Sequence, residues 1–250
     1  MAELRQWVWL CGSILLAVAA TQGAWWLWKW EKSHARLARF VHFPLFSPLL
    51  QIARLLYYVG FPFAALRWGH AVFPLILGLK SPLSNDLQIN WVDWLNDIGW
   101  AAGLGIAAWS ILSLGWWMAR KTAPTPFVPT DSGGALWLHM REAFFHETHW
   151  SFYRNAPIVL LGPYWGIWAG LALVAVEALL NPWRWSALRQ PEHVPALLIR
   201  AGLAILSCAV YIQTTNLWVT ILVHGGITWT LALLARALVP PPAISSGEAL

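Results

Sequence analysis

The chain has 250 residues, of which 58% are hydrophobic and only 11% are Asp, Glu, Lys or Arg, and its formal net charge is +5. This composition excludes an ordinary soluble domain, and it excludes a nucleic-acid binder because the positive charge gathers near the ends of apolar segments. It is typical of a multispanning membrane protein, so we expect an all-α helical bundle of about six to eight helices, multi-pass in the cell membrane.

The N-terminal half, residues 1–120, contains three apolar segments that are long enough to cross a bilayer. They cover about 7–28, 43–66 and 98–118, and a membrane helix needs roughly 20 largely apolar residues. Basic residues follow the first segment, so we expect that loop in the cytoplasm and the N-terminus outside. A further apolar piece at 70–79 is too short to cross.

Residues 121–134, KTAPTPFVPTDSGG, are rich in Pro, Thr, Ser and Gly, which predicts a linker. The C-terminal half, residues 135–238, should begin with a helix at about 135–155 that Asp131 or Ser132 caps. The sequence leaves open whether this helix crosses the membrane. Further spans are expected at about 157–180, 195–213 and 215–237, and a disordered tail at 239–250.

The segment REAFFHETHWSFYR, residues 141–154, concentrates ionisable side chains in an otherwise apolar chain. On a helix, two neighbouring stripes of polar residues result: His139, Glu142, His146, His149 and Tyr153 in one, and Glu147, Trp150 and Arg154 in the other. Such side chains at membrane depth usually face a bundle interior or a polar cavity and mark function. The alternative is a helix on the membrane surface with solvated charges.

The last span carries a second set of polar residues. His224 lies in the middle of it, with Thr220 and Thr228 one turn away on either side and Asn216 two turns earlier. Gly225 and Gly226 permit close approach of another helix. The alternative is a histidine that is hydrogen-bonded in the core and has no chemical role.

No bound cofactor or metal is expected. Cys11 and Cys208 are far apart, so they form neither a disulfide framework nor a zinc site. HETHW is not an HExxH zinc motif, because the second histidine comes three residues after the first. Spacing alone would permit a metal site, but it is a weak signal for one; the ligands would be Glu142, His146, His149 and His224.

The stretches ETHWSFYR and NLWVTILVH resemble the CPBP family of intramembrane proteases (CAAX proteases and bacteriocin-processing enzymes, also called Abi). The resemblance covers roughly residues 135–237. Family members carry a Glu-Glu-x-x-x-Arg motif, a Phe-x-x-x-His motif on a later helix and a final His-x-x-x-Asn or His-x-x-x-Asp. The resemblance implies peptide hydrolysis within the membrane, in which glutamate and histidine activate water and His with Asn forms an oxyanion hole.

The match to these motifs is partial. Arg154 fits the motif arginine and His224 fits the last histidine, but His149 and Trp150 stand where the two glutamates are expected. Thr228 stands where Asn or Asp is expected. No Phe-x-x-x-His is present, and Glu177 is the only ionisable residue in that span.

The resemblance therefore implies that Glu142 or Glu147 activates water, that Arg154 orients a glutamate, and that His224 acts as base or oxyanion contact. Either the acid has moved and pairs with His146 or His149, or the activity is degraded. His149 is a further candidate catalytic residue, and supporting roles fall to His146, Thr228 and Asn216.

The expected substrate is a hydrophobic or prenylated peptide or protein, and the expected surroundings are the lipid bilayer. The competing interpretation is a non-catalytic membrane subunit, which would pack against partner membrane proteins in a photosynthetic or respiratory complex. Its basis is the abundance of tryptophan, 21 residues, and the altered motifs.

Overall fold

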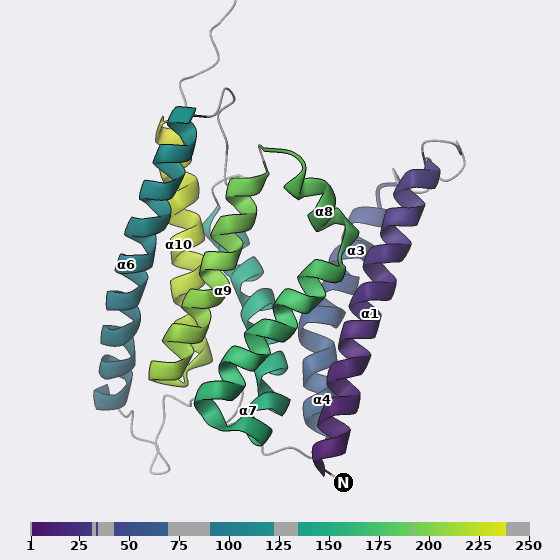
Figure 1. Ribbon diagram of the computed structural model, residues 1–250, viewed down its shortest axis with the longest axis horizontal. Helices are drawn as coiled ribbons and strands as arrows, with labels where there is room; N and C mark the ends of the chain where they lie inside the picture. Colours follow the sequence, from purple (N-terminus) through teal and green to yellow (C-terminus); the bar gives the residue numbers. More distant parts are fainter. Residues whose placement is uncertain are drawn as a thin grey trace, which may run out of the picture.

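The computed structural model describes residues 2–31, 34, 43–69, 91–122, 135–191 and 193–238. Every regular element in these ranges is a helix, which confirms the all-α fold. In chain order the elements are α1 (Ala2–Glu31), α3 (Phe46–Leu55), the π-helix η1 (Leu56–Gly60), α4 (Phe61–Gly69), α6 (Trp91–Thr122), α7 (Leu136–Leu180), α8 (Pro182–Leu188), α9 (Val194–Thr214) and α10 (Leu217–Leu238) (Figure 1).

The helices confirm a multi-pass membrane protein. Among the described residues, five helices are long and apolar enough to cross a bilayer: α1, α6, α7, α9 and α10. The outer helices present apolar side chains outward, as at Leu15 on α1 and Ile111 on α6, which are 69% and 71% exposed. Such surfaces are unfavourable in water and suit contact with lipid.

Helix α7 contains both segments that the sequence predicts, at about 135–155 and 157–180, and moves the boundary between them to Gly162. It runs unbroken through Pro157 and reverses direction at Gly162, where φ is 76° and ψ is 171°. This backbone conformation is open essentially to glycine alone. Pro163 follows at the first position of the second arm, where its missing N–H is no loss.

The two arms of α7, residues 136–161 and 163–180, pack against each other as an antiparallel hairpin. A Cβ added to Gly166 would lie 2.3 Å from Cα of Ile158, and one added to Gly170 would lie 2.7 Å from Cα of Arg154. Both contacts are symmetric about the turn, and Figure 1 shows the helix folding back on itself. At 1.5 Å per residue the arms measure about 39 and 27 Å, so both reach across most of a bilayer core.

Other boundaries agree with or refine the prediction. The spans at about 7–28, 98–118, 195–213 and 215–237 lie within or nearly within α1, α6, α9 and α10, whereas the segment at 43–66 is a continuous run through α3, η1 and α4. The N-cap of α7 is Ala135, without a side-chain cap, so neither Asp131 nor Ser132 takes that position.

Helix α8 was not predicted from the sequence. The piece at 70–79, residues 123–134 of the linker and the tail lie outside the described residues.

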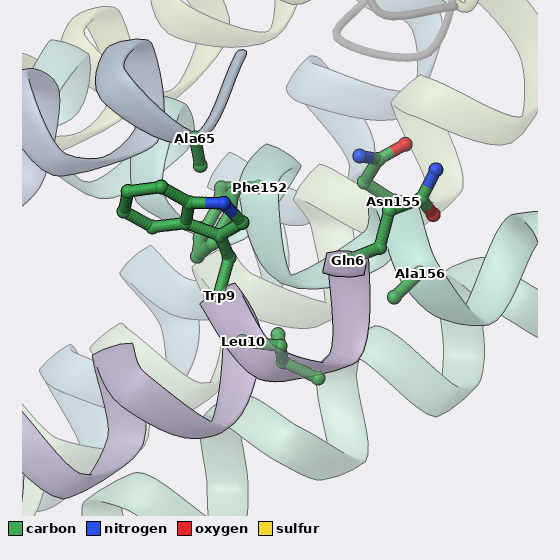
Figure 2. Close-up of a pocket in the computed structure, with 7 residues that line it drawn as sticks. All are labelled: Gln6, Trp9, Leu10, Ala65, Phe152, Asn155 and Ala156. Carbon is green, nitrogen blue, oxygen red and sulfur yellow. The ribbon is translucent and has the colours of Figure 1, made fainter. Parts of the chain in front are cut away.

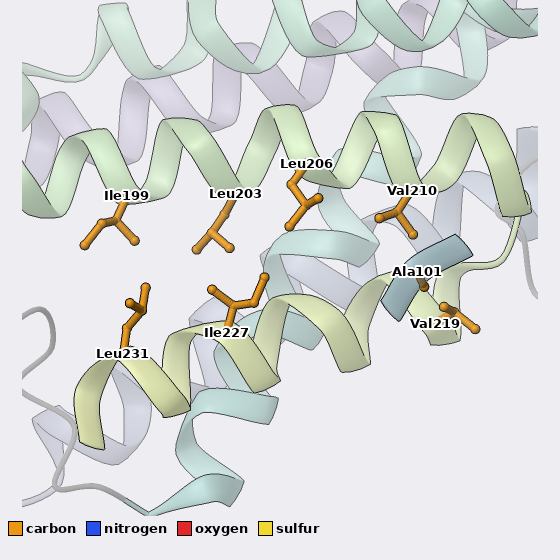
Figure 3. Packing of buried hydrophobic residues seen from close by; sticks show 8 residues of the cluster. All are labelled: Ala101, Ile199, Leu203, Leu206, Val210, Val219, Ile227 and Leu231. Carbon is orange, nitrogen blue, oxygen red and sulfur yellow. The ribbon is translucent and has the colours of Figure 1, made fainter. Parts of the chain in front are cut away.

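The first arm of α7 lies between two apolar clusters. One joins α6, α9 and α10, and Figure 3 shows side chains of α9 and α10 pointing toward one another beside Ala101 of α6. The other joins α1, α4 and α7 around Leu10, Phe152 and Tyr153. Both halves of the chain thus contribute to the packing around this arm, which explains why residues 151–157 are all buried.

The packing between α1, α4 and α7 is close. A cavity of about 10 Å³ lies there, lined by apolar side chains with the amides of Gln6 and Asn155 at one side (Figure 2). This volume matches about one water molecule. It is far too small to admit a peptide.

Candidate functional site

Glu147 is the centre of a buried polar cluster between the first arm of α7, α9 and α10. Its Oε1 accepts a hydrogen bond from Nδ1 of His224 at 2.8 Å, and its Oε2 accepts one from Oγ of Ser207 at 2.5 Å. Nη2 of Arg154 lies 3.5 Å from Oε2 and also donates to Ser207. The cluster confirms that Glu147 and Arg154 share a helix face and that His224 turns toward it.

The burial of this cluster determines which atoms can react. The Glu147 side chain is fully buried and that of Arg154 is 2% exposed, whereas the His224 ring is 8% exposed. Because the Glu147 side chain is fully buried and both its oxygens accept hydrogen bonds, its carboxylate is closed to bulk water. Glu147 instead holds the His224 ring by its Nδ1, which leaves Nε2 as the reactive nitrogen.

A second carboxylate–imidazole pair lies on the other flank of the same arm. Nε2 of His149 donates to Oε2 of Glu177 at 3.0 Å. The hairpin of α7 makes this contact, because its second arm carries Glu177 back to the level of His149. Here the imidazole is 2% exposed and the carboxylate 21% exposed, the reverse of the first pair.

Tyrosines from η1 and α7 surround this second pair. The hydroxyl of Tyr57 lies 3.3 Å from Nε2 of His149 and donates to Oε1 of Glu177 at 3.5 Å. Ser13 of α1 is within 3.4 Å of the Tyr57 hydroxyl and 3.3 Å of the Tyr153 hydroxyl. The π-turn of η1 places Tyr57 here, and such turns frequently mark functional positions in long helices.

Aromatic and imidazole rings connect the two pairs. The rings of His146 and His224 are stacked at 6.1 Å, and Trp150 lies 5.5 Å from His224. Tyr58 lies 5.6 Å from His146 and 5.2 Å from His149. The first arm of α7 therefore has one continuous polar flank, as its helical periodicity predicted, with a carboxylate–imidazole pair at each side.

Glu142, in contrast, belongs to neither pair. It forms ion pairs with Arg54 of α3 and, at 2.8 Å, with Arg141. Its side chain is 31% exposed. Among the residues that the structure describes, no hydrogen bond or ion pair joins Glu142 to an imidazole, so its predicted pairing with His146 or His149 is wrong.

Asn216 and Thr228 also have local structural roles. Oδ1 of Asn216 accepts from the backbone N–H of Trp218 at 3.2 Å, which caps α10, and its amide donates to Asp97 of α6 at 2.9 Å. The Thr228 hydroxyl donates to the backbone carbonyls of His224 and Gly225 at 3.1 and 3.0 Å. The predicted supporting roles of both residues at the reacting centre are therefore not supported by their contacts.

The alternative of a metal site is also corrected. In the part of the chain that the structure describes, no group of three or more His, Cys, Asp or Glu side chains is arranged to hold a metal ion. Glu142 points to arginines, and His149 and His224 each bond a different glutamate. Three of the candidate ligands lie on α7 and His224 lies on α10, and the four do not converge on one point.

Reasoning from the sequence missed several residues in or beside the two carboxylate–imidazole pairs. The sequence could have identified Glu177 as a candidate site residue, since it is the only ionisable residue in its apolar span. Nothing in the sequence marks Ser207, Tyr57 or Tyr58 as candidates, because a serine or a tyrosine in an apolar helix is usually a packing residue. Their importance depends on which helices become neighbours.

Comparison with protein-family models, with curated proteins and with solved structures finds no match to this chain.

Proposed function

We propose that the protein is an intramembrane peptide hydrolase in which Glu177 and His149 activate water. The observation that supports this proposal is their 3.0 Å contact, in which the carboxylate is partly exposed and the imidazole is buried. A general base must reach both a water molecule and a partner that stabilises its charge. Glu177 is 21% exposed and bonded to His149, whereas Glu147 is fully buried.

The resemblance to the CPBP family supports the same pair. His149 stands where the first motif glutamate is expected, and Glu177 lies in the span where the family histidine is expected. The residue types are exchanged, but the pair still consists of one carboxylate and one imidazole. An exchange of this kind preserves the chemistry because either order leaves a carboxylate beside an N–H donor.

The proposed reaction begins with a proton transfer from water to Glu177. The hydroxide attacks the carbonyl carbon of the peptide bond, and the C–N bond breaks when Glu177 returns the proton to the leaving nitrogen. His149 donates to Glu177 throughout and keeps the carboxylate oriented. His224, held by Glu147, stabilises the negative charge on the carbonyl oxygen when its imidazole is protonated.

We further propose that the protein lies in the cell membrane with the end of the bundle at α8 facing the cytoplasm. Figure 1 shows α8, the end of α1 and the end of α6 at the same end of the bundle. Basic residues in the described ranges gather at these helix ends, as the positive-inside rule requires of a cytoplasmic face: Lys29, Lys121, Arg184 and Arg189.

The proposal is tested with protein reconstituted in lipid nanodiscs and a library of apolar peptides that carry a quenched fluorophore. Glu177→Gln should lower kcat by roughly 10²–10⁴-fold, the usual contribution of a general base. Glu142→Gln is the matched control, since it removes a carboxylate from the same bundle outside both pairs, and it should leave kcat within about twofold.

Full activity of a folded Glu177→Gln variant would show that another group activates water. If the folded wild-type protein cleaves no peptide and co-purifies with a stoichiometric membrane partner, the non-catalytic subunit is the better interpretation.

A further inference from the structure

Tryptophan rings join the end of α1 to the short helix α8. The ring centroid of Trp183 lies 4.9 Å from that of Trp25 and 5.2 Å from that of Trp28, and the two α1 rings lie 5.3 Å apart. The amide of Gln22 adds a hydrogen bond across the same contact, to the carbonyl of Leu180 at 3.3 Å. These contacts hold α8 against α1 at one end of the bundle (Figure 1).

Outside this contact, α1 and α8 each present three exposed residues on one helix face. The spacing is i, i+3, i+4 in both helices, which places the three side chains together. In α8 the third residue is the C-cap Arg189, whose φ and ψ are still helical. The apolar members of the set are between 48% and 58% exposed. We call the whole set the α1–α8 surface: Trp26, Lys29, Trp30, Trp185, Leu188 and Arg189.

The two basic residues of the α1–α8 surface have no acidic partner among the described residues. Every ion pair within those ranges involves other side chains. Nζ of Lys29 instead lies 5.2 Å from the ring centroid of Trp25 and 5.9 Å from that of Trp26. Arg189 is exposed at the end of α8. Cations that are held beside exposed apolar rings favour a ligand that combines an anionic group with apolar chains.

The composition of the α1–α8 surface suits the boundary between acyl chains and headgroups. Indole rings concentrate at that level of a bilayer because they combine an apolar face with a polar N–H. Lys and Arg lay their apolar stems along the same level and carry their charges into the headgroups. The centre of an interface with another protein would instead be depleted of lysine. Anionic phospholipid therefore matches both the apolar part and the charge of this surface.

A second cation–aromatic pair shows what distinguishes the α1–α8 surface. On α6, Nζ of Lys121 lies 4.5 Å from the ring centroid of Trp117, which is 52% exposed. There a single helix supplies one cation and one ring. At the α1–α8 surface, two helices that are packed together supply two cations, and their attractions for an anionic headgroup add.

We propose that the α1–α8 surface binds anionic phospholipid, with the phosphate beside Lys29 and Arg189 and the acyl chains against the tryptophans. The inference is independent of the proposed hydrolysis, because neither carboxylate–imidazole pair belongs to this surface.

Native mass spectrometry measures this binding without any need for enzymatic activity. The full chain in dodecyl maltoside is titrated with phosphatidylglycerol or with phosphatidylcholine, and the bound lipids are counted. Each basic residue near an anionic headgroup contributes about fivefold in affinity. With two such residues, we expect the first phosphatidylglycerol to bind roughly 25-fold more tightly than the first phosphatidylcholine.

Lys29→Gln and Arg189→Gln should each weaken phosphatidylglycerol binding about fivefold and leave phosphatidylcholine binding unchanged. Lys121→Gln is the matched control, because it removes a lysine that also lies over a tryptophan ring but stands outside the surface. It should bind phosphatidylglycerol within about twofold of wild type. Equal affinity of the wild-type protein for the two lipids, or equal losses in Lys29→Gln and Lys121→Gln, would overturn the proposal.

A second arm distinguishes a lipid from a soluble phosphate. Glycerol 3-phosphate carries a phosphate group without acyl chains, so an excess of it should leave phosphatidylglycerol bound. Displacement of the lipid by this compound would show that the surface recognises soluble phosphate, and the lipid proposal would fail.

Discussion

The two carboxylate–imidazole pairs on the first arm of α7 contain the same chemical groups but differ in which group is exposed. In the Glu147–His224 pair the carboxylate is fully buried and engaged by Ser207 and Arg154. In the Glu177–His149 pair the imidazole is buried and the carboxylate is 21% exposed. The first carboxylate is suited to holding other groups in place, and the second to reacting with water. The chemical role of such a pair therefore depends on its surroundings as much as on its composition.

The largest expected effect comes from breaking the first pair. Glu147→Ala leaves the guanidinium of Arg154 buried without its counter-charge, which should lower the free energy of unfolding by about 3–5 kcal/mol. Unfolding by SDS in mixed micelles, followed by tryptophan fluorescence, measures this. Glu177→Ala is the comparison and should cost much less, since its side chain is partly solvated. Equal losses for the two variants would contradict the difference between the pairs.

The next largest loss of stability is expected at the hairpin of α7, which brings Glu177 to His149. Gly166→Ala places a Cβ against the backbone of Ile158, so the arms must separate, and overpacking of this kind costs about 1–3 kcal/mol. Gly103→Ala on α6 is the matched control, because no atom lies within 4 Å of its added Cβ. The same SDS titration compares them, and an unchanged stability of Gly166→Ala would argue against the close contact of the arms.

A smaller effect, on the hydrolysis rate, should distinguish the two tyrosines beside the second pair. Tyr57→Phe removes the hydroxyl that donates to Glu177, and one such hydrogen bond contributes about 1 kcal/mol. Tyr58→Phe is the control, since no hydrogen bond of its hydroxyl is found among the described residues. Hydrolysis rates in nanodiscs should fall roughly fivefold for Tyr57→Phe and stay close to wild type for Tyr58→Phe, given the same constant. The reverse order would place the reacting centre beside Tyr58.

The smallest effect is expected at Glu142, which lies outside both pairs. Its ion pairs with Arg54 and Arg141 are about one third exposed, and pairs of this kind contribute about 0–1 kcal/mol. Glu142→Gln should therefore shift the unfolding midpoint only slightly, and less in high salt. A loss above about 2 kcal/mol would show that Glu142 has a structural role comparable to that of Glu147.

The amino-acid sequence by itself determined the class of the protein and the position of its polar helix. Apolar runs of sufficient length predict membrane helices wherever they occur, because the bilayer requires every backbone group to be bonded within its own segment. The 3.6-residue period likewise placed Glu147 and Arg154 on one face. The partial match of Arg154 and His224 to family motifs was also visible in the residues alone.

Only the tertiary structure decided which ionisable groups meet. Gly162 and Pro163 could have signalled a turn, but only the hairpin shows that Glu177 returns to His149. Likewise, Glu142 and Glu147 are equally good candidates in the sequence, and they differ only because α3 supplies an arginine to one and α9 and α10 supply Ser207 and His224 to the other. Helical periodicity orients a side chain about its own axis, whereas the identity of its partner depends on helices that are distant in the sequence.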